Sequence, residues 1–148
     1  MTTQTEWAHL PNAKYIDMIL ANLKLHATIW AGAPYDVSRN VAWHTARGVA
    51  GPEAISAWNT AWPVVSVSVQ DEVYGEACGE AYDDACDAAM GAILALIAYD
   101  DCAYMFDCDL DEIKILAKLG DPRAILLLPA CIAFNRSKEL ENGYHVQQ

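Results

Sequence analysis

Apolar residues recur along most of the chain at intervals of three and four positions, the spacing that places them on one face of an α-helix. The first such stretch follows Asn12, a residue type that often caps the start of a helix. Its apolar positions are Tyr15, Ile16, Ile19, Leu20 and Leu23. Since glycine is favoured just past the last turn of a helix, we predict that this one ends near Ala31 or Gly32.

Proline and glycine predict the next boundaries, because proline fits the first turn of a helix and glycine follows its last turn. A second helix is predicted from Pro34 to Gly48, and a third from Gly51 to Trp62. These two helices contain three of the five tryptophans, and most of the five are expected in the core. The five are Trp7, Trp30, Trp43, Trp58 and Trp62, the last two of which would share one helix face.

The run Val64–Val69 alternates valine and serine, as a β-strand with one buried face does. No other run in the sequence alternates in this way, so a strand here would have nothing to pair with. We therefore interpret the run as the first turns of a helix that begins at Pro63, with a strand as the alternative. From Asp71 to Phe106 the pattern is helical almost throughout and predicts two segments.

The last third of the chain contains the clearest helix boundaries. Asp109 and Glu112 form a capping box ahead of an apolar stretch, and Gly120 marks the end of that stretch. Asp121 followed by Pro122 is typical of the start of another helix. Two further helices are therefore predicted after residue 108.

A four-residue pattern in the middle of the chain predicts how the helices pack. It begins with Glu76-Ala77-Cys78-Gly79 and repeats an alanine every fourth residue, at Ala77, Ala81, Ala85 and Ala89. Four residues advance about 400° around an α-helix, so these alanines form a slanted, low ridge that lets a neighbouring helix approach closely. We predict an all-α fold, a compact multi-helix bundle with alanine-ridge packing. It forms a single domain over residues 1–148, with loose termini at 1–11 and 142–148.

Two groups of segments in the chain are distinctive. The first group consists of the Ala-Trp tetrads Val41-Ala-Trp-His44, Ser56-Ala-Trp-Asn59 and Thr60-Ala-Trp-Pro63. The second consists of Ala92-Ile-Leu-Ala-Leu-Ile-Ala-Tyr-Asp-Asp101, Leu116-Ala-Lys-Leu-Gly-Asp-Pro122 and Ala124-Ile-Leu-Leu-Leu-Pro-Ala130. In these segments the chain resembles the Ala/Trp/Asp-rich helical proteins classed among the immunity proteins of bacterial toxin systems, which also occur in phage genomes. The resemblance covers roughly Trp43 to Phe134, departs from the family pattern by fewer tryptophans and by the Val/Ser run, and implies an α-helical fold and a binding role.

Length, hydropathy and cysteine usage add the expected compartment. At 148 residues, of which 54% are apolar, the chain suits one domain with a substantial core. The first ten residues are polar and contain Glu6, unlike a signal peptide, and the longest apolar stretch, Ala88–Tyr99, is well short of the roughly 20 residues that span a bilayer. Five cysteines without a CxxC pair are typical of reduced, buried thiols. We expect a cytoplasmic protein with no membrane segment.

Charge is the feature that points to a function. The net charge is −11, and the stretch from Gly48 to Ile113 contains fourteen acidic residues and no Lys or Arg. Such a surface repels nucleic acid and attracts basic proteins. The acids of the repeat lie three, four or seven positions apart, on one side of a helix. We therefore predict partner binding by Glu76, Glu80, Asp83, Asp84 and Asp87.

Other polar residues suggest structural roles before chemical ones. Asp100 and Asp101 follow an apolar run, but neighbouring helical residues point about 100° apart and do not chelate one ion. With Asp121 and Arg123 they are expected to form a buried polar cluster, in which an aspartate pairs with the arginine or caps the next helix. The four histidines have no metal-ligand spacing, so no catalytic residue, metal or cofactor is predicted.

The preferred function is an acidic binding protein that neutralises a basic partner such as a toxin, a nuclease or a defence complex, without binding nucleic acid or a membrane directly. One alternative is a phage-encoded inhibitor that mimics DNA and blocks a host CRISPR or restriction complex. A second alternative is a small enzyme with a site built from His44, Asp100 and Asp101. The sequence is also compatible with a homodimer.

Overall fold

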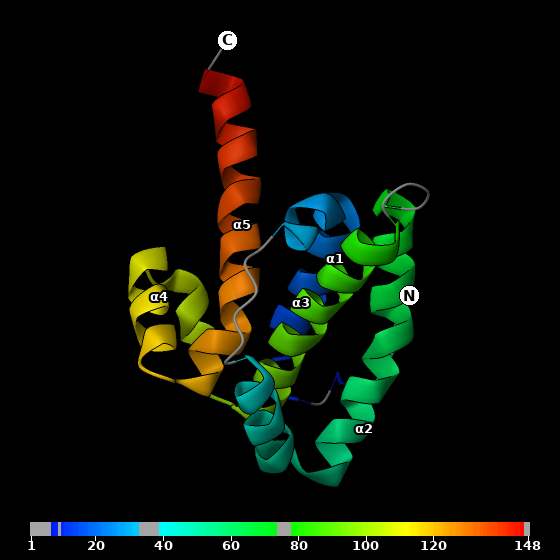
Figure 1. Cartoon of the computed structure of the whole chain (residues 1–148), viewed down its shortest axis with the longest axis vertical. Coiled ribbons are helices and arrows are strands. Elements are labelled where there is room, and N and C mark those ends of the chain that lie inside the picture. Colours follow the sequence, from blue (N-terminus) through cyan, green and yellow to red (C-terminus); the bar gives the residue numbers. More distant parts are fainter. Residues whose placement is uncertain (1–6, 9, 33–38, 74–77, 147–148) are drawn as a thin grey trace.

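The computed structural model describes residues 7–8, 10–32, 39–73 and 78–146, and within these it contains helices and no strand. The all-α prediction is therefore confirmed (Figure 1). In chain order the elements are α1 (Ala13–Ala31), α2 (Arg39–Val73), α3 (Cys78–Ala98), the 3-10 helix η1 (Ala103–Asp107), α4 (Leu110–Lys118) and α5 (Pro122–Val146).

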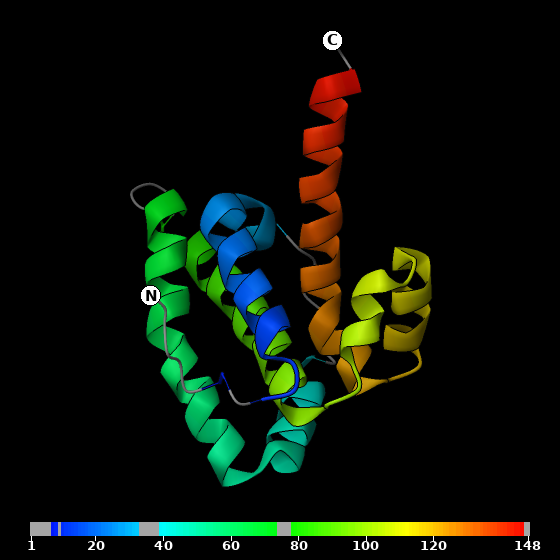
Figure 2. The same ribbon diagram turned by 180° about the vertical axis from the view of Figure 1, so that it is seen from behind.

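Helix α3 lies at the centre of the bundle and contacts α1, α2 and α5. Its second half is buried on every side, from Ala88 to Ile97. A helix that is apolar all round is expected in a core or a membrane. Here α1, the long arm of α2 and α5 surround it, as both ribbon views show (Figures 1 and 2). None of the described helices is long and apolar enough to cross a membrane.

The predicted alanine ridge is present where the structure describes it. Ala85 and Ala89 on α3 are fully buried, while Ala77 lies outside the described residues and nothing is described of the Ala81 side chain. On α2, Ala57 and Ala61 are also buried and four residues apart. These small side chains let α2 and α3 pack closely along their length.

Helix α2 consists of two helical arms that meet at Gly51, whose φ of 83° and ψ of 169° interrupt the helix. The predicted start of a helix at this glycine is confirmed, whereas the predicted end of the preceding helix at Gly48 is wrong, because the first arm continues through Ala50. The predicted start at Pro34 lies outside the described residues. In the ribbon the two arms meet at a sharp corner (Figure 2). This backbone conformation is accessible almost only to glycine.

The prediction of a helix boundary at Pro63 is wrong, because the second arm of α2 continues from Pro52 to Val73. Because proline has no backbone N–H, the carbonyl four residues earlier, that of Asn59, lacks its helical hydrogen bond. Pro63 and Asn59 are both exposed, so water can bond that carbonyl. The valine and serine run is helical, with Val65 and Val69 buried four residues apart.

The helix that precedes α5 ends as predicted at Gly120, which has a φ of 89°. The Gly120 N–H donates to the Ala117 carbonyl, and the Asp121 N–H donates to the Leu116 carbonyl. This pair of bonds is the Schellman motif, which satisfies the last carbonyls of α4. The chain then reverses direction into α5, so that α4 packs beside α5 on the side away from α1 (Figure 1).

Some described residues of the two predicted loose termini belong to the folded structure. Trp7 lies within the predicted loose segment 1–11, yet it is 3% exposed and its indole N–H donates to Asp17 at 3.0 Å. At the other end, α5 continues past residue 142 to Val146 and extends beyond the rest of the bundle (Figure 1).

Candidate functional site

Three of the predicted binding acids form an exposed patch on the first half of α3. Asp83, Asp84 and Asp87 are exposed, whereas Ala85 and Cys86 between them are buried. We call these three aspartates the acidic face. Asp87 is three residues from Asp84 and four from Asp83, so it shares a side of the helix with each of them, while the neighbours Asp83 and Asp84 point about 100° apart. Of the other two predicted acids, Glu76 lies outside the described residues and nothing is described of the Glu80 side chain.

A pocket of about 410 Å³ adjoins the acidic face. The sequence did not predict this pocket. It lies between α2 and α3, and its volume falls in the range of small-ligand sites. We call it the tryptophan pocket. Its lining residues are Trp43, Trp58, Asn59, Trp62, Asp87 and Met90.

Ring contacts and one hydrogen bond hold the walls of the tryptophan pocket. The Trp43 and Trp58 rings meet edge to face, with centroids 5.5 Å apart and an interplanar angle of 78°. The Trp58 indole N–H donates to the Met90 carbonyl of α3 at 2.9 Å. The Arg47 guanidinium lies 5.6 Å from the centroid of the Trp58 ring, a cation–π contact.

The tryptophans divide between the core and this pocket. Trp7 and Trp30 are buried, as expected of most of the five. Trp43 and Trp58 are half-buried, and Trp62 is 43% exposed, so the expectation of burial is wrong for Trp62. The predicted shared face of Trp58 and Trp62 is confirmed, because both line the same pocket.

The predicted polar cluster forms around Arg123, but at the surface. Arg123 pairs with Asp121 at 3.1 Å and with Asp101 at 3.3 Å. Burial of the aspartates at 100 and 101 was predicted wrongly, because Asp100 is exposed and the Asp101 side chain is 79% exposed. Asp121 and Arg123 are partly buried, at 19% and 27% exposure. The turn after α3 and the start of α5 are thus joined by one ion pair, Asp101–Arg123, that solvent reaches.

Asp121 also caps α5. Its side chain accepts a hydrogen bond from the Arg123 backbone N–H at 2.9 Å and others from the Arg123 guanidinium. Partial burial raises the pKa of this carboxyl, but the hydrogen bonds from Arg123 outweigh burial and hold the pKa below its usual range. Both groups therefore serve the fold.

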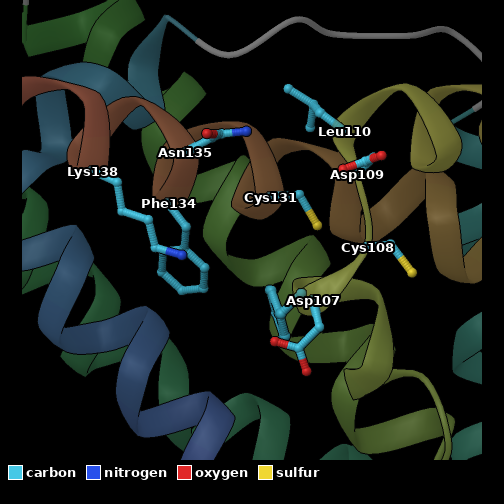
Figure 3. A pocket seen from close by; sticks show the side chains of 9 residues that line it. Asp107, Cys108, Asp109, Leu110, Cys131, Phe134, Asn135 and Lys138 are labelled. Carbon is cyan, nitrogen blue, oxygen red and sulfur yellow. The ribbon is translucent and has the colours of Figure 1, made fainter. Parts of the chain in front are cut away.

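A second pocket, of about 300 Å³, lies between α5 and the segment that joins η1 to α4 (Figure 3). Asp107, Cys108 and Asp109 line one side of it, while Cys131 and Lys138 line the α5 side. Burial raises the pKa of the Cys131 thiol to about 12, and both burial and the nearby Glu112 raise that of Cys108. Thiols with raised pKa values stay protonated at neutral pH and are poor nucleophiles.

Tyr99 is the remaining unusual polar group. Its hydroxyl is buried and has no hydrogen-bond partner in the described part of the chain. The pKa of Tyr99 is raised above its usual value, mainly by burial and to a smaller extent by the negative charge of Asp121. The hydroxyl therefore stays neutral at physiological pH, which lowers the cost of leaving it without a partner.

The described contacts do not support the alternative of an enzyme site at His44, Asp100 and Asp101. His44 lies on α2, all three residues are exposed, and no hydrogen bond or ion pair links the histidine to either aspartate in the described structure. Among the described residues, no group of three or more His, Cys, Asp and Glu side chains is arranged to hold a metal ion.

The acidic face with its adjoining tryptophan pocket combines exposed carboxylates, one exposed and two half-buried tryptophans, and a concavity. Interface hot spots are enriched in tryptophan, which makes this combination typical of a protein-binding surface. Comparison with known proteins adds no homologue to this assignment, because no family model, no curated protein and no solved structure matches the chain.

Proposed function

We propose that this chain is an acidic binding protein that neutralises a basic protein partner, in the manner of an immunity protein that inhibits a toxin or nuclease. The observation that supports the proposal best is the exposure of Asp83, Asp84 and Asp87 beside a pocket with three tryptophans. The acids attract a basic surface, and the aromatic pocket offers apolar area that an association can bury.

The charge distribution supports this role in a second way. Like charges three or four residues apart each cost a few tenths of a kcal/mol in a helix. Asp83 and Asp84 form no ion pair with any described residue. An acidic patch that faces solvent attracts a cationic partner, because the fields of its carboxylates add.

The proposal predicts that removing charge from the acidic face slows association. The variant Asp83→Asn, Asp84→Asn, Asp87→Asn keeps the shape of these side chains and raises the net charge by three. We expect an on-rate lower by about tenfold at low ionic strength and a flatter dependence on salt, with stability unchanged or slightly higher. A partner captured from the native host would be used to measure both rates by surface plasmon resonance.

A matched control separates the acidic face from overall charge. Asp100, Asp107 and Asp111 are also exposed aspartates but belong to the turn after α3, to η1 and to α4. Replacing these three by asparagine changes the net charge by the same amount. If this control slows association as much as the acidic-face variant does, steering comes from net charge and the proposed site is wrong.

The DNA-mimic alternative uses the same surface against a different target. The two hypotheses differ in whether DNA competes with this chain for the target. DNA displaces a mimic from the nucleic-acid groove of its target, whereas it does not displace a chain that binds its partner elsewhere. Adding duplex DNA to the same binding measurement at constant salt distinguishes them.

A further inference from the structure

The tryptophan pocket has the composition of a site for an organic cation. Two indole rings meet at right angles, a third tryptophan lies one helical turn from Trp58, and the Asp87 carboxylate lines the same space. Aromatic faces attract cations through the ring quadrupole, and a carboxylate at the edge adds a charge of opposite sign. We propose that this pocket binds the side chain of an arginine from a basic protein partner. This inference rests on the proposed function and names the contact that would anchor it.

The chemistry of the lining favours arginine over lysine. Apart from Asn59 and Asp87, the lining consists of tryptophan and methionine side chains, which offer no hydrogen bonds to a strongly hydrated ammonium group. A guanidinium is more weakly hydrated, stacks flat on indole rings and matches a carboxylate with two parallel donors. The pocket thus offers a ring to stack on and a negative charge at its edge, at a volume that accommodates one long side chain.

An arginine of the chain itself, Arg47, already makes the cation–π part of this interaction. The Arg47 guanidinium lies over the Trp58 ring at 5.6 Å and is not part of the pocket lining. This contact shows that the Trp58 ring accepts a guanidinium in the folded protein. It also places a positive charge near the pocket, which opposes a second cation, whereas Asp83, Asp84 and Asp87 of the neighbouring acidic face attract one.

The test uses a single arginine residue as the probe, without any partner protein. Nα-acetyl-arginine methylamide is titrated into the full chain while the indole N–H signals are followed by two-dimensional NMR. We expect saturable shifts for Trp43, Trp58 and Trp62, with Trp7 and Trp30 unchanged because both are buried outside the pocket. The citrulline analogue has nearly the same shape without the charge, and it should bind about tenfold more weakly.

One further probe tests the type of cation. The lysine analogue should bind several times more weakly than the arginine probe. Equal binding of the citrulline probe, or equal or tighter binding of the lysine probe, overturns the assignment.

Variants of the chain complete the test in both directions. Trp62→Ala removes an exposed wall of the pocket and should weaken the arginine probe about tenfold, whereas Arg47→Ala removes the competing cation and should strengthen it about threefold. Unchanged affinity in Trp62→Ala contradicts the inference. The probe needs no partner, so its failure leaves the salt-dependent association of the acidic face standing, and failure of that association leaves the pocket result standing.

Discussion

At the scale of single residues, the sequence predicted where helices begin better than how their first turns are satisfied. Asn12, Asp109 and Asp121 each precede a helix as expected, but only Asp121 caps its helix with a side-chain hydrogen bond. The Asn12 amide instead donates to the Leu96 and Tyr99 carbonyls at the end of α3. Those carbonyls are more than 80 residues away along the chain, so no local pattern predicts the bond.

Removing the Asp121 side chain should lower stability in a pH-dependent way. Asp121→Ala loses the cap and the ion pair with Arg123, and we expect the free energy of unfolding at pH 7 to fall by about 0.5–2 kcal/mol. Asp121→Asn keeps an oxygen for the cap, so its loss should be smaller. Urea unfolding of both variants beside the parent measures the two effects.

The pH dependence of the same comparison has a definite sign. A carboxyl whose pKa is lower in the folded state stabilises the fold above its unfolded pKa of about 3.9, and this contribution is lost as pH falls through the folded-state pKa. The parent should therefore be more stable than Asp121→Asn at pH 7 and lose that advantage as the pH falls through the folded-state pKa of Asp121. An advantage that persists at low pH would show that the Asp121 charge contributes nothing.

At the scale of helices, glycine and proline predicted the boundaries unevenly. Gly51 interrupts α2 because its φ of 83° and ψ of 169° exclude other residues, so this boundary follows from the residue type. Pro63 lies in an exposed position where the helix loses one hydrogen bond and continues. Whether a proline ends a helix depends on tertiary packing against α3, which the sequence alone does not contain.

Two glycines of α2 provide a matched pair for substitution by alanine. A Cβ atom at either position meets nothing within 4 Å, so only backbone conformation distinguishes them. Gly51→Ala should cost about 1–3 kcal/mol because of its positive φ. Gly48→Ala should stabilise by about 0.4–1 kcal/mol, because Gly48 lies within a helix and alanine has less backbone entropy to lose. Thermal unfolding of both variants checks the opposite signs, and a shared sign would contradict the two-arm description of α2.

At the scale of the whole molecule, the sequence indicated the core and part of the surface. The apolar stretch after Ala88 became the buried centre, since its length and composition leave no polar face to expose. The tryptophan pocket could not be predicted, because it requires α2 to lie beside α3 and so brings Trp43 and Trp62 to Asp87. Local spacing found the acidic face on α3, and the pocket depends on tertiary structure.

Thiol reactivity should report the protection of the core. Cys86, Cys102 and Cys131 are buried, Cys108 is half-buried, and nothing is described of the Cys78 side chain. Burial raises the pKa values of Cys102 and Cys131 to about 12, which leaves little reactive thiolate at neutral pH. After a short pulse of iodoacetamide, mass spectrometry should find Cys108 modified at least about a hundredfold faster than these two. In urea all should react, and equal rates in the native protein would contradict the packing of α3 against α5.

The bond from Asn12 to the end of α3 also has a consequence for synthesis of the chain on the ribosome. The Leu96 carbonyl that accepts it lies 84 residues after Asn12. At elongation rates of about 5–20 residues per second, that separation corresponds to roughly 4–17 seconds. During this interval α1, whose Ile16, Ile19 and Leu23 are buried in the folded protein, lacks α3, one of the three helices that pack against it. The nascent chain therefore presents an apolar helix that chaperones can bind until α3 leaves the exit tunnel.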